Sequence, residues 1–213
     1  MSDADDSLNP QTPHPEPIIL KGCRRVGVLA DTHIPHRSKE MPPTVHNLLR
    51  GCDVILHAGD LESPDILEPL RHIAPTYAVR GNLHWQFSTG THDQNLPLAL
   101  TFKIGNHVMW MTHGHMRFRY SVIDKMKAFT DHRTLAGVNK SLVARLRRMK
   151  PDDATIVVFG HSHLSCAVTI DGVLYFNPGA VTSSSIQQSK EMPRVGILNF
   201  REDDTIGYEW REI

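Results

Sequence analysis

The fold is decided by residues 25–60, RVGVLADTHIPHRSKEMPPTVHNLLRGCDVILHAGD, in which two short apolar runs flank a helical pattern. The run that starts at Arg25 ends at Asp31, as in a strand buried in a mainly parallel sheet. The segment PPTVHNLLRG has proline at its start and Gly51 at its end, which is typical of a helix. The second apolar run ends at Asp60 and predicts another strand, so the stretch indicates a strand–helix–strand unit.

The alternation of strands and helices continues beyond Asp60. A helix is expected over residues 63–73 and a third strand over 76–82, which together indicate a βαβαβ unit. Residues 98–115 contain two alternating runs joined by Gly105-Asn106, which predicts an antiparallel hairpin and therefore a mixed sheet. Further strands are expected at residues 154–160, 166–177, 194–200 and 205–210.

The composition is that of an ordinary soluble globular protein. The chain has 213 residues, of which 40% are hydrophobic and 22% are charged. It has 23 basic and 23 acidic residues, so net charge favours neither nucleic acid nor an anionic membrane as a partner. No apolar run approaches the roughly 20 residues that a membrane-spanning helix needs. We therefore expect no association with a membrane.

The N-terminal segment and the cysteines both predict a cytoplasmic location. Residues 1–17 contain four prolines and four acidic residues but no lysine or arginine, which is typical of a disordered tail and unlike a secretory signal. The three cysteines, Cys23, Cys52 and Cys166, lack the spacing of a disulfide framework or a structural zinc site. The remaining residues, 18–213, are expected to form a single domain.

The chain contains one strongly basic segment, although its total net charge is zero. Residues 117–150 contain ten basic and two acidic residues and show a helical pattern, so their local charge is about +8. We expect a basic helical insertion here. It is either the solvated face of helices or a positive wall beside the functional site that favours multiply phosphorylated substrates.

Histidine-rich polar clusters occur where five predicted strands end. In open α/β sheets ligands bind at that edge, because the loops after the strands converge there. A single cluster of this kind arises easily by chance, whereas five in order predict a metal centre. Carboxylate, amide and imidazole groups suit Mn²⁺, Fe or Zn²⁺, and their number suffices for two ions. The clusters are Asp31-Thr32-His33, Gly59-Asp60, Gly81-Asn82-Leu83-His84, His113-Gly114-His115 and Gly160-His161-Ser162-His163.

The motifs of this chain resemble those of the calcineurin-like metallophosphoesterase superfamily. They are DTH, GD, GN, HGH and GHSH, together with NPGA at residues 177–180. Within it the chain is similar to the small single-domain prokaryotic phosphodiesterases, over residues 25 to about 210. The resemblance implies an α/β fold of the αββα type, a sandwich of two mixed sheets flanked by helices. GDLESPD and GNLH differ from the corresponding motifs of the protein Ser/Thr phosphatases, which disfavours that activity.

The resemblance also implies two divalent metal ions bridged by Asp60. Manganese is the expected metal, with iron, zinc and nickel as alternatives, and a hydroxide held by the ions would be the nucleophile. By resemblance, one ion would be bound by Asp31, His33, Asp60 and His163, and the other by Asp60, Asn82, His113 and His161.

Three further histidines have open roles. His84 stands two positions after Asn82, where close relatives carry an acidic residue, and is the expected proton donor to the leaving group. His115 either contacts the substrate phosphate or turns outward. His57 either orients Asp60 or is a core histidine bonded to the backbone.

The expected function is therefore a dinuclear metal-dependent phosphoesterase that hydrolyses phosphodiesters or small phosphorylated metabolites. Two alternatives are a non-catalytic protein-binding scaffold with the same fold and a nuclease. The complete set of seven ligand positions argues against the scaffold, and the lack of an additional DNA-binding domain argues against the nuclease, so nucleic acid is not the favoured partner. We also expect a homo-oligomer.

Overall fold

The structure is a computed structural model that describes residues 16–81, 96–114, 135–182 and 191–213. The expected tail falls almost wholly outside these ranges. So do Asn82, His84 and His115, and the first part of the basic segment.

The first of two sheets contains the predicted βαβαβ unit. Its strands β2 (Arg25–Leu29), β3 (Val54–His57) and β4 (Thr76–Ala78) run parallel. The strands are connected by α1 (Pro43–Leu48) and by η2 (Pro64–Ile66) with α2 (Leu67–Arg71). Ser63 caps this helical segment as expected, at the start of the 3₁₀ helix η2, where its hydroxyl accepts the backbone N–H of Asp65. The strands β10 (Arg194–Phe200) and β11 (Ile206–Glu212) add antiparallel to β2, giving the order β11-β10-β2-β3-β4.

The second sheet contains the predicted hairpin and is mixed. The hairpin strands β5 (Ala99–Ile104) and β6 (His107–Thr112) pair antiparallel around Gly105. β7 (Ile156–Val158) lies parallel to β6, and β9 (Val173–Asn177) lies between β7 and β8 (Cys166–Ile170). With the short β1 (Ile18–Ile19) at one edge, the order is β1-β5-β6-β7-β9-β8.

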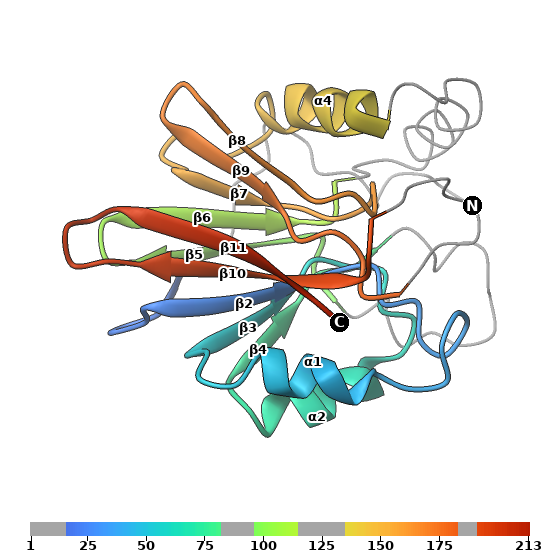
Figure 1. The fold of residues 1–213 in the computed structure, drawn as a ribbon. Coiled ribbons are helices and arrows are strands. Elements are labelled where there is room, and N and C mark those ends of the chain that lie inside the picture. Colours follow the sequence, from blue (N-terminus) through green and yellow to red (C-terminus); the bar gives the residue numbers. More distant parts are fainter. Residues whose placement is uncertain (1–15, 82–95, 115–134, 183–190) are drawn as a thin grey trace.

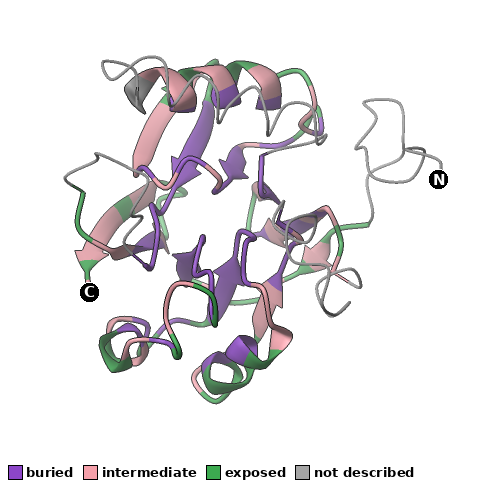
Figure 2. Cartoon of the chain, turned by 90° about the vertical axis from the view of Figure 1, so that its right-hand side faces the viewer, coloured by how far each residue is buried: buried purple, intermediate pink, exposed green. Residues whose placement is uncertain are grey.

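The two sheets face each other and helices cover both outer faces, which confirms the αββα sandwich (Figure 1). The central core combines residues of both sheets, such as Val28 and Leu56 from one and Met109 and Val158 from the other. α1 and α2 pack on the outer face of the five-stranded sheet. α4 (Leu135–Leu146) packs on the other sheet. The central strands are largely buried, whereas the edge strands β8 and β11 and much of the helix surface are partly or fully exposed (Figure 2).

The described part of the basic segment contains an amphipathic helix, α4. Leu142, Val143 and Leu146 of α4 are buried against the six-stranded sheet, whereas Lys140 is exposed. This arrangement is the one expected for a solvated helical face. None of the helices in the described ranges is both long enough and apolar enough to span a membrane.

Candidate metal centre

Two neighbouring parallel strands place the first three candidate ligands at one edge of the five-stranded sheet. Asp31 and His33 follow β2, and Asp60 follows β3. The two loops are joined by backbone hydrogen bonds, because the Asp31 N–H donates to the Gly59 carbonyl and the His33 N–H donates to the Asp60 carbonyl, each at 3.0 Å. Asp31, His33 and Asp60 all have positive φ angles, between 48° and 59°. Such backbone strain in non-glycine residues is typical of functional sites.

The histidines of the GHSH motif reach the same place from the six-stranded sheet. His161 and His163 follow β7 and also have positive φ angles, 73° and 60°. Their loop is held by the buried Asn177 side chain, which donates to the Gly160 carbonyl at 2.9 Å and to the Ser162 hydroxyl at 3.0 Å. The NPGA motif therefore positions the histidine loop.

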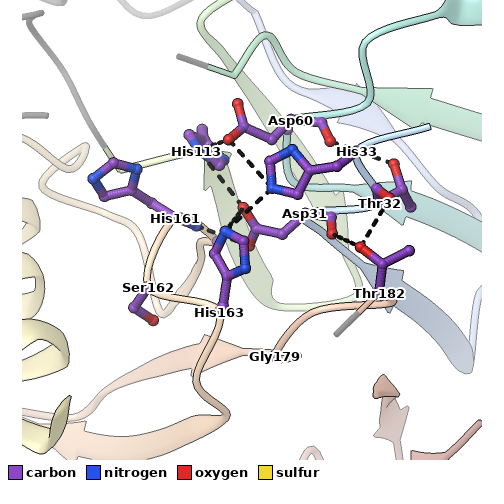
Figure 3. A network of polar contacts seen from close by, with 12 residues as sticks. Asp31, Thr32, His33, Asp60, His113, His161, Ser162, His163, Gly179 and Thr182 are labelled. Carbon is purple, nitrogen blue, oxygen red and sulfur yellow. Dashed lines mark hydrogen bonds and ion pairs between the residues drawn. The ribbon is translucent and has the colours of Figure 1, made fainter. Parts of the chain in front are cut away.

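Six of the predicted ligands converge at the junction of the two sheets (Figure 3). Asp60 Oδ2 lies 3.8 Å from His33 Nε2 and 3.4 Å from His113 Nε2. Asp31 Oδ1 lies 3.4 Å from His163 Nε2 and 3.9 Å from His113 Nε2. The His161 side chain lies edge-on to His113, with their ring centroids 5.2 Å apart. Asp60 thus lies between His33 on one side and His113 on the other.

Burial and mutual attraction set the charges of this cluster. Burial raises the pKa of Asp31 to about 6. Burial alone would lower the pKa of His113, but Asp60 and Asp31 outweigh it and raise this pKa to about 9. Burial would likewise raise the pKa of Asp60, yet His113 and His33 hold it well below its ordinary value. A protonated His113 therefore balances Asp60 when no ion is bound, and a divalent ion would displace that proton.

The described donor set fits a divalent metal ion. Ligand atoms of Asp31, His33, Asp60 and His163 all lie within 4.8 Å of one another. Among the described residues, Asp31 Oδ1 is buried without a hydrogen-bond partner, although it faces the cluster. A buried carboxylate oxygen of this kind is costly unless a cation satisfies it. Carboxylate oxygens with imidazole nitrogens are suitable ligands for manganese, iron and zinc.

Hydrogen bonds to the backbone orient two of the candidate ligands. His113 Nδ1 lies 2.7 Å from the Ala58 carbonyl, to which it donates, so its Nε2 faces the cluster. The Asp31 carboxylate accepts the backbone N–H of His161 through Oδ2 at 3.0 Å, which leaves Oδ1 turned inward. Supporting contacts of this type hold metal ligands in place in proteins.

His57 is close to the centre but does not orient the Asp60 carboxylate. Its Nε2 lies 3.1 Å from the Thr32 hydroxyl, and its Nδ1 accepts the Gly59 N–H at 3.2 Å. Burial lowers the pKa of His57 to about 3, so it stays neutral. The interpretation of His57 as a core histidine bonded to the backbone is the one that these contacts favour.

Two charged residues beside the centre were missed by reasoning from the sequence. Glu62 Oε1 lies 3.4 Å from His33 Nδ1, and Arg37 Nη1 donates to His163 Nδ1 at 3.2 Å. The signals that could have found them are their positions, two residues after Asp60 and four residues after His33. The predicted residues Asn82, His84 and His115 lie outside the described ranges.

The chain is similar to known proteins in sequence and in fold. Residues 25–203 match the family model described as the calcineurin-like phosphoesterase superfamily domain. A probable metallophosphoesterase of Methanothermobacter thermautotrophicus is 31% identical over 157 residues, which are 74% of this chain and 77% of that protein. One of Methanocaldococcus jannaschii is 27% identical over 77% of this chain and 71% of its own length. The crystal structure of Entamoeba histolytica Vps29 complexed with zinc has a similar fold, with a TM-score of 0.60 at 22% identity over 88% of this chain and 98% of that one.

Proposed function

The chain belongs to the calcineurin-like phosphoesterase superfamily, and we propose that it is a dinuclear metal-dependent phosphoesterase. Its substrates would be phosphodiesters or small phosphorylated metabolites. The expected ions are manganese. The cytoplasmic location, the homo-oligomer and the single domain over residues 18–213 stay predictions from the sequence.

The observation that carries the proposal is the position of the Asp60 carboxylate between His33 and His113. Its Oδ2 atom is 3.8 Å from His33 Nε2 and 3.4 Å from His113 Nε2. A carboxylate in that position suits two ions at once. In the proposed assignment, one ion would be held by Asp31, His33, Asp60 and His163, and the other by Asp60, His113, His161 and Asn82.

Two bound ions would supply Lewis acidity, which lowers the pKa of water toward neutrality and stabilises negative charge on a phosphate. The chain's own residues would hold the ions in place and limit the access of water to them. Asp31, His33, Asp60 and His113 are almost completely buried, so bulk water is excluded from their inner side. The strained loops after β2, β3 and β7 fix these donors before substrate binds.

Two basic side chains in the described part of the basic segment are engaged within the protein, which weakens the nuclease alternative. Arg147 forms an ion pair with Asp171 in the turn between β8 and β9. The Arg145 guanidinium donates to the Gly114 carbonyl at 3.2 Å. Both side chains thus have partners within the protein, as expected for a solvated helical face that is anchored to the sheet.

The test is turnover by the manganese-loaded protein on nitrophenyl phosphate as a monoester and bis(nitrophenyl) phosphate as a diester. We expect hydrolysis of at least one ester, and its loss in Asp60→Asn while circular dichroism stays unchanged. Asp152→Asn is the matched control, since Asp152 is an exposed carboxylate in the turn before β7. Wild-type rates in Asp60→Asn would contradict the proposal, and a loaded wild type that hydrolyses neither ester would favour the scaffold.

A further inference from the structure

Arg37 lies beside the candidate metal centre. Its backbone N–H donates to the His33 carbonyl at 2.7 Å, and this turn brings the arginine back toward the cluster. The side chain is half-buried, and its Nη1 donates to His163 Nδ1 at 3.2 Å. Arg37 is therefore held at the edge of the centre, on the side of His163.

The guanidinium of Arg37 has few hydrogen-bond acceptors around it within the described part of the chain. Guanidinium carries five N–H donors and no acceptor. Among the described residues, no carboxylate lies within ion-pair distance of it, and the only hydrogen bond from its side chain goes to His163. A half-buried cation of this kind, next to a phosphoesterase centre, is suited to bind an anion. Its planar fork matches two oxygens of a phosphate group.

The contact between Arg37 and His163 is incompatible with metal ligation. His163 Nε2 faces the cluster, 3.4 Å from Asp31 Oδ1. A histidine that binds an ion through Nε2 carries its ring hydrogen on Nδ1, which then donates instead of accepting. Arginine can only donate, so it cannot keep its bond to Nδ1. An ion at His163 would therefore release the guanidinium.

We propose that Arg37 binds the phosphate group of the substrate once ions occupy the centre. The inference rests on the proposed function and deepens it. The released guanidinium would donate to phosphate oxygens that do not leave in the reaction, so it would act in substrate binding and not as a metal ligand. In the metal-free protein the same side chain is held on His163.

The test separates phosphate binding from metal binding. Wild type, Arg37→Gln, Arg37→Lys and the control Arg71→Gln are loaded with Mn²⁺, and their metal content and calorimetric affinity for inorganic phosphate are measured. Arg71 is an exposed residue at the end of α2 that pairs with Glu68 at 3.0 Å. Loss of a hydrogen bond between charged groups predicts an increase of about 10- to 100-fold in the Kd for phosphate in Arg37→Gln, and a smaller one in Arg37→Lys. Arg71→Gln should bind phosphate like the wild type.

Metal content distinguishes substrate binding from a structural role. Arg37→Gln should hold at least as much manganese as the wild type, because a cation next to the ions has been removed. If Arg37 only positions His163, the variant will instead lose metal, and this result would overturn the proposal. An unchanged phosphate affinity at wild-type metal content would also overturn it, while leaving the phosphoesterase proposal intact. A wild type that binds metal but neither phosphate nor ester would overturn both.

Discussion

Gly81→Ala should damage the metal centre through a single added methyl group. A Cβ atom at Gly81 would lie 1.9 Å from Asp60 Oδ1, 2.2 Å from Asp60 N and 2.7 Å from Asp60 Cα. The carboxylate can rotate away, but the two backbone atoms cannot. Ordinary contact begins near 3.4 Å, so the backbones at Gly81 and Asp60 must separate by roughly 1 Å.

The size of the effect follows from that displacement. A misplacement of about 1 Å in a catalytic group costs on the order of 100-fold in rate. Overpacking typically lowers the free energy of unfolding by about 1–3 kcal/mol. Gly81 does not have a positive φ angle, so alanine brings no backbone penalty of its own there. We expect a folded protein that holds fewer than two ions and hydrolyses esters at least about 100-fold more slowly.

The assay combines manganese content after gel filtration, turnover of bis(nitrophenyl) phosphate and urea denaturation. Gly172→Ala is the control, because Gly172 has a φ of +76° and no atom within 4 Å of the added Cβ. Its left-handed backbone predicts a loss of about 1–2 kcal/mol without any effect on the centre. If Gly81→Ala keeps two ions and turns over as fast as Gly172→Ala, the close contact between Gly81 and Asp60 does not position the Asp60 carboxylate.

Three further predictions concern histidines in and around the centre. His163→Ala and His161→Ala should each retain about one ion per chain by elemental analysis, and two ions in either would contradict the assignment. His57 has its pKa lowered from 6.5 to about 3 by burial, so below pH 6.5 the unfolded chain binds a proton that the folded one does not. The free energy of unfolding of the metal-free protein should therefore fall as the pH is lowered from 6.5 toward 3, by up to about 1.4 kcal/mol per pH unit from this residue. Urea titrations at several pH values should show a shallower dependence on pH in His57→Gln, and an equal dependence in both proteins would refute the prediction. His84→Ala should slow esters with poor alkoxide leaving groups more than nitrophenyl esters, and equal losses would exclude a proton donor.

The arrangement of the ligands could be predicted because each lies directly after a strand. Asp31 and Asp60 end neighbouring parallel strands, so the direction of the strands alone brings them to one edge. His163 comes from the other sheet, and its place followed from the family resemblance, since periodicity does not show how two sheets face each other. The fold class was predicted in a similar way, because the alternation of strands and helices indicated an α/β fold and the family resemblance implied the αββα sandwich.

The supporting contacts could not be predicted, because they join residues far apart in the sequence. Arg37 and His163 are separated by 126 positions, and Asn139 of α4 accepts a hydrogen bond from the Ser162 hydroxyl at 2.7 Å. Such pairs depend on how the loops turn. Asp31 and His163 have positive φ angles, yet neither is a glycine or an asparagine, the residue types that would have indicated such a backbone in the sequence. Neither local pattern nor composition indicates them.

The proposed function depends above all on Asp60 being shared by two ions. The most direct test is a crystal structure of the protein grown with Mn²⁺, in which anomalous scattering locates each manganese. We expect two anomalous peaks about 3.5 to 4 Å apart, with the Asp60 carboxylate between them. A single peak, or two peaks of which only one contacts Asp60, would contradict it.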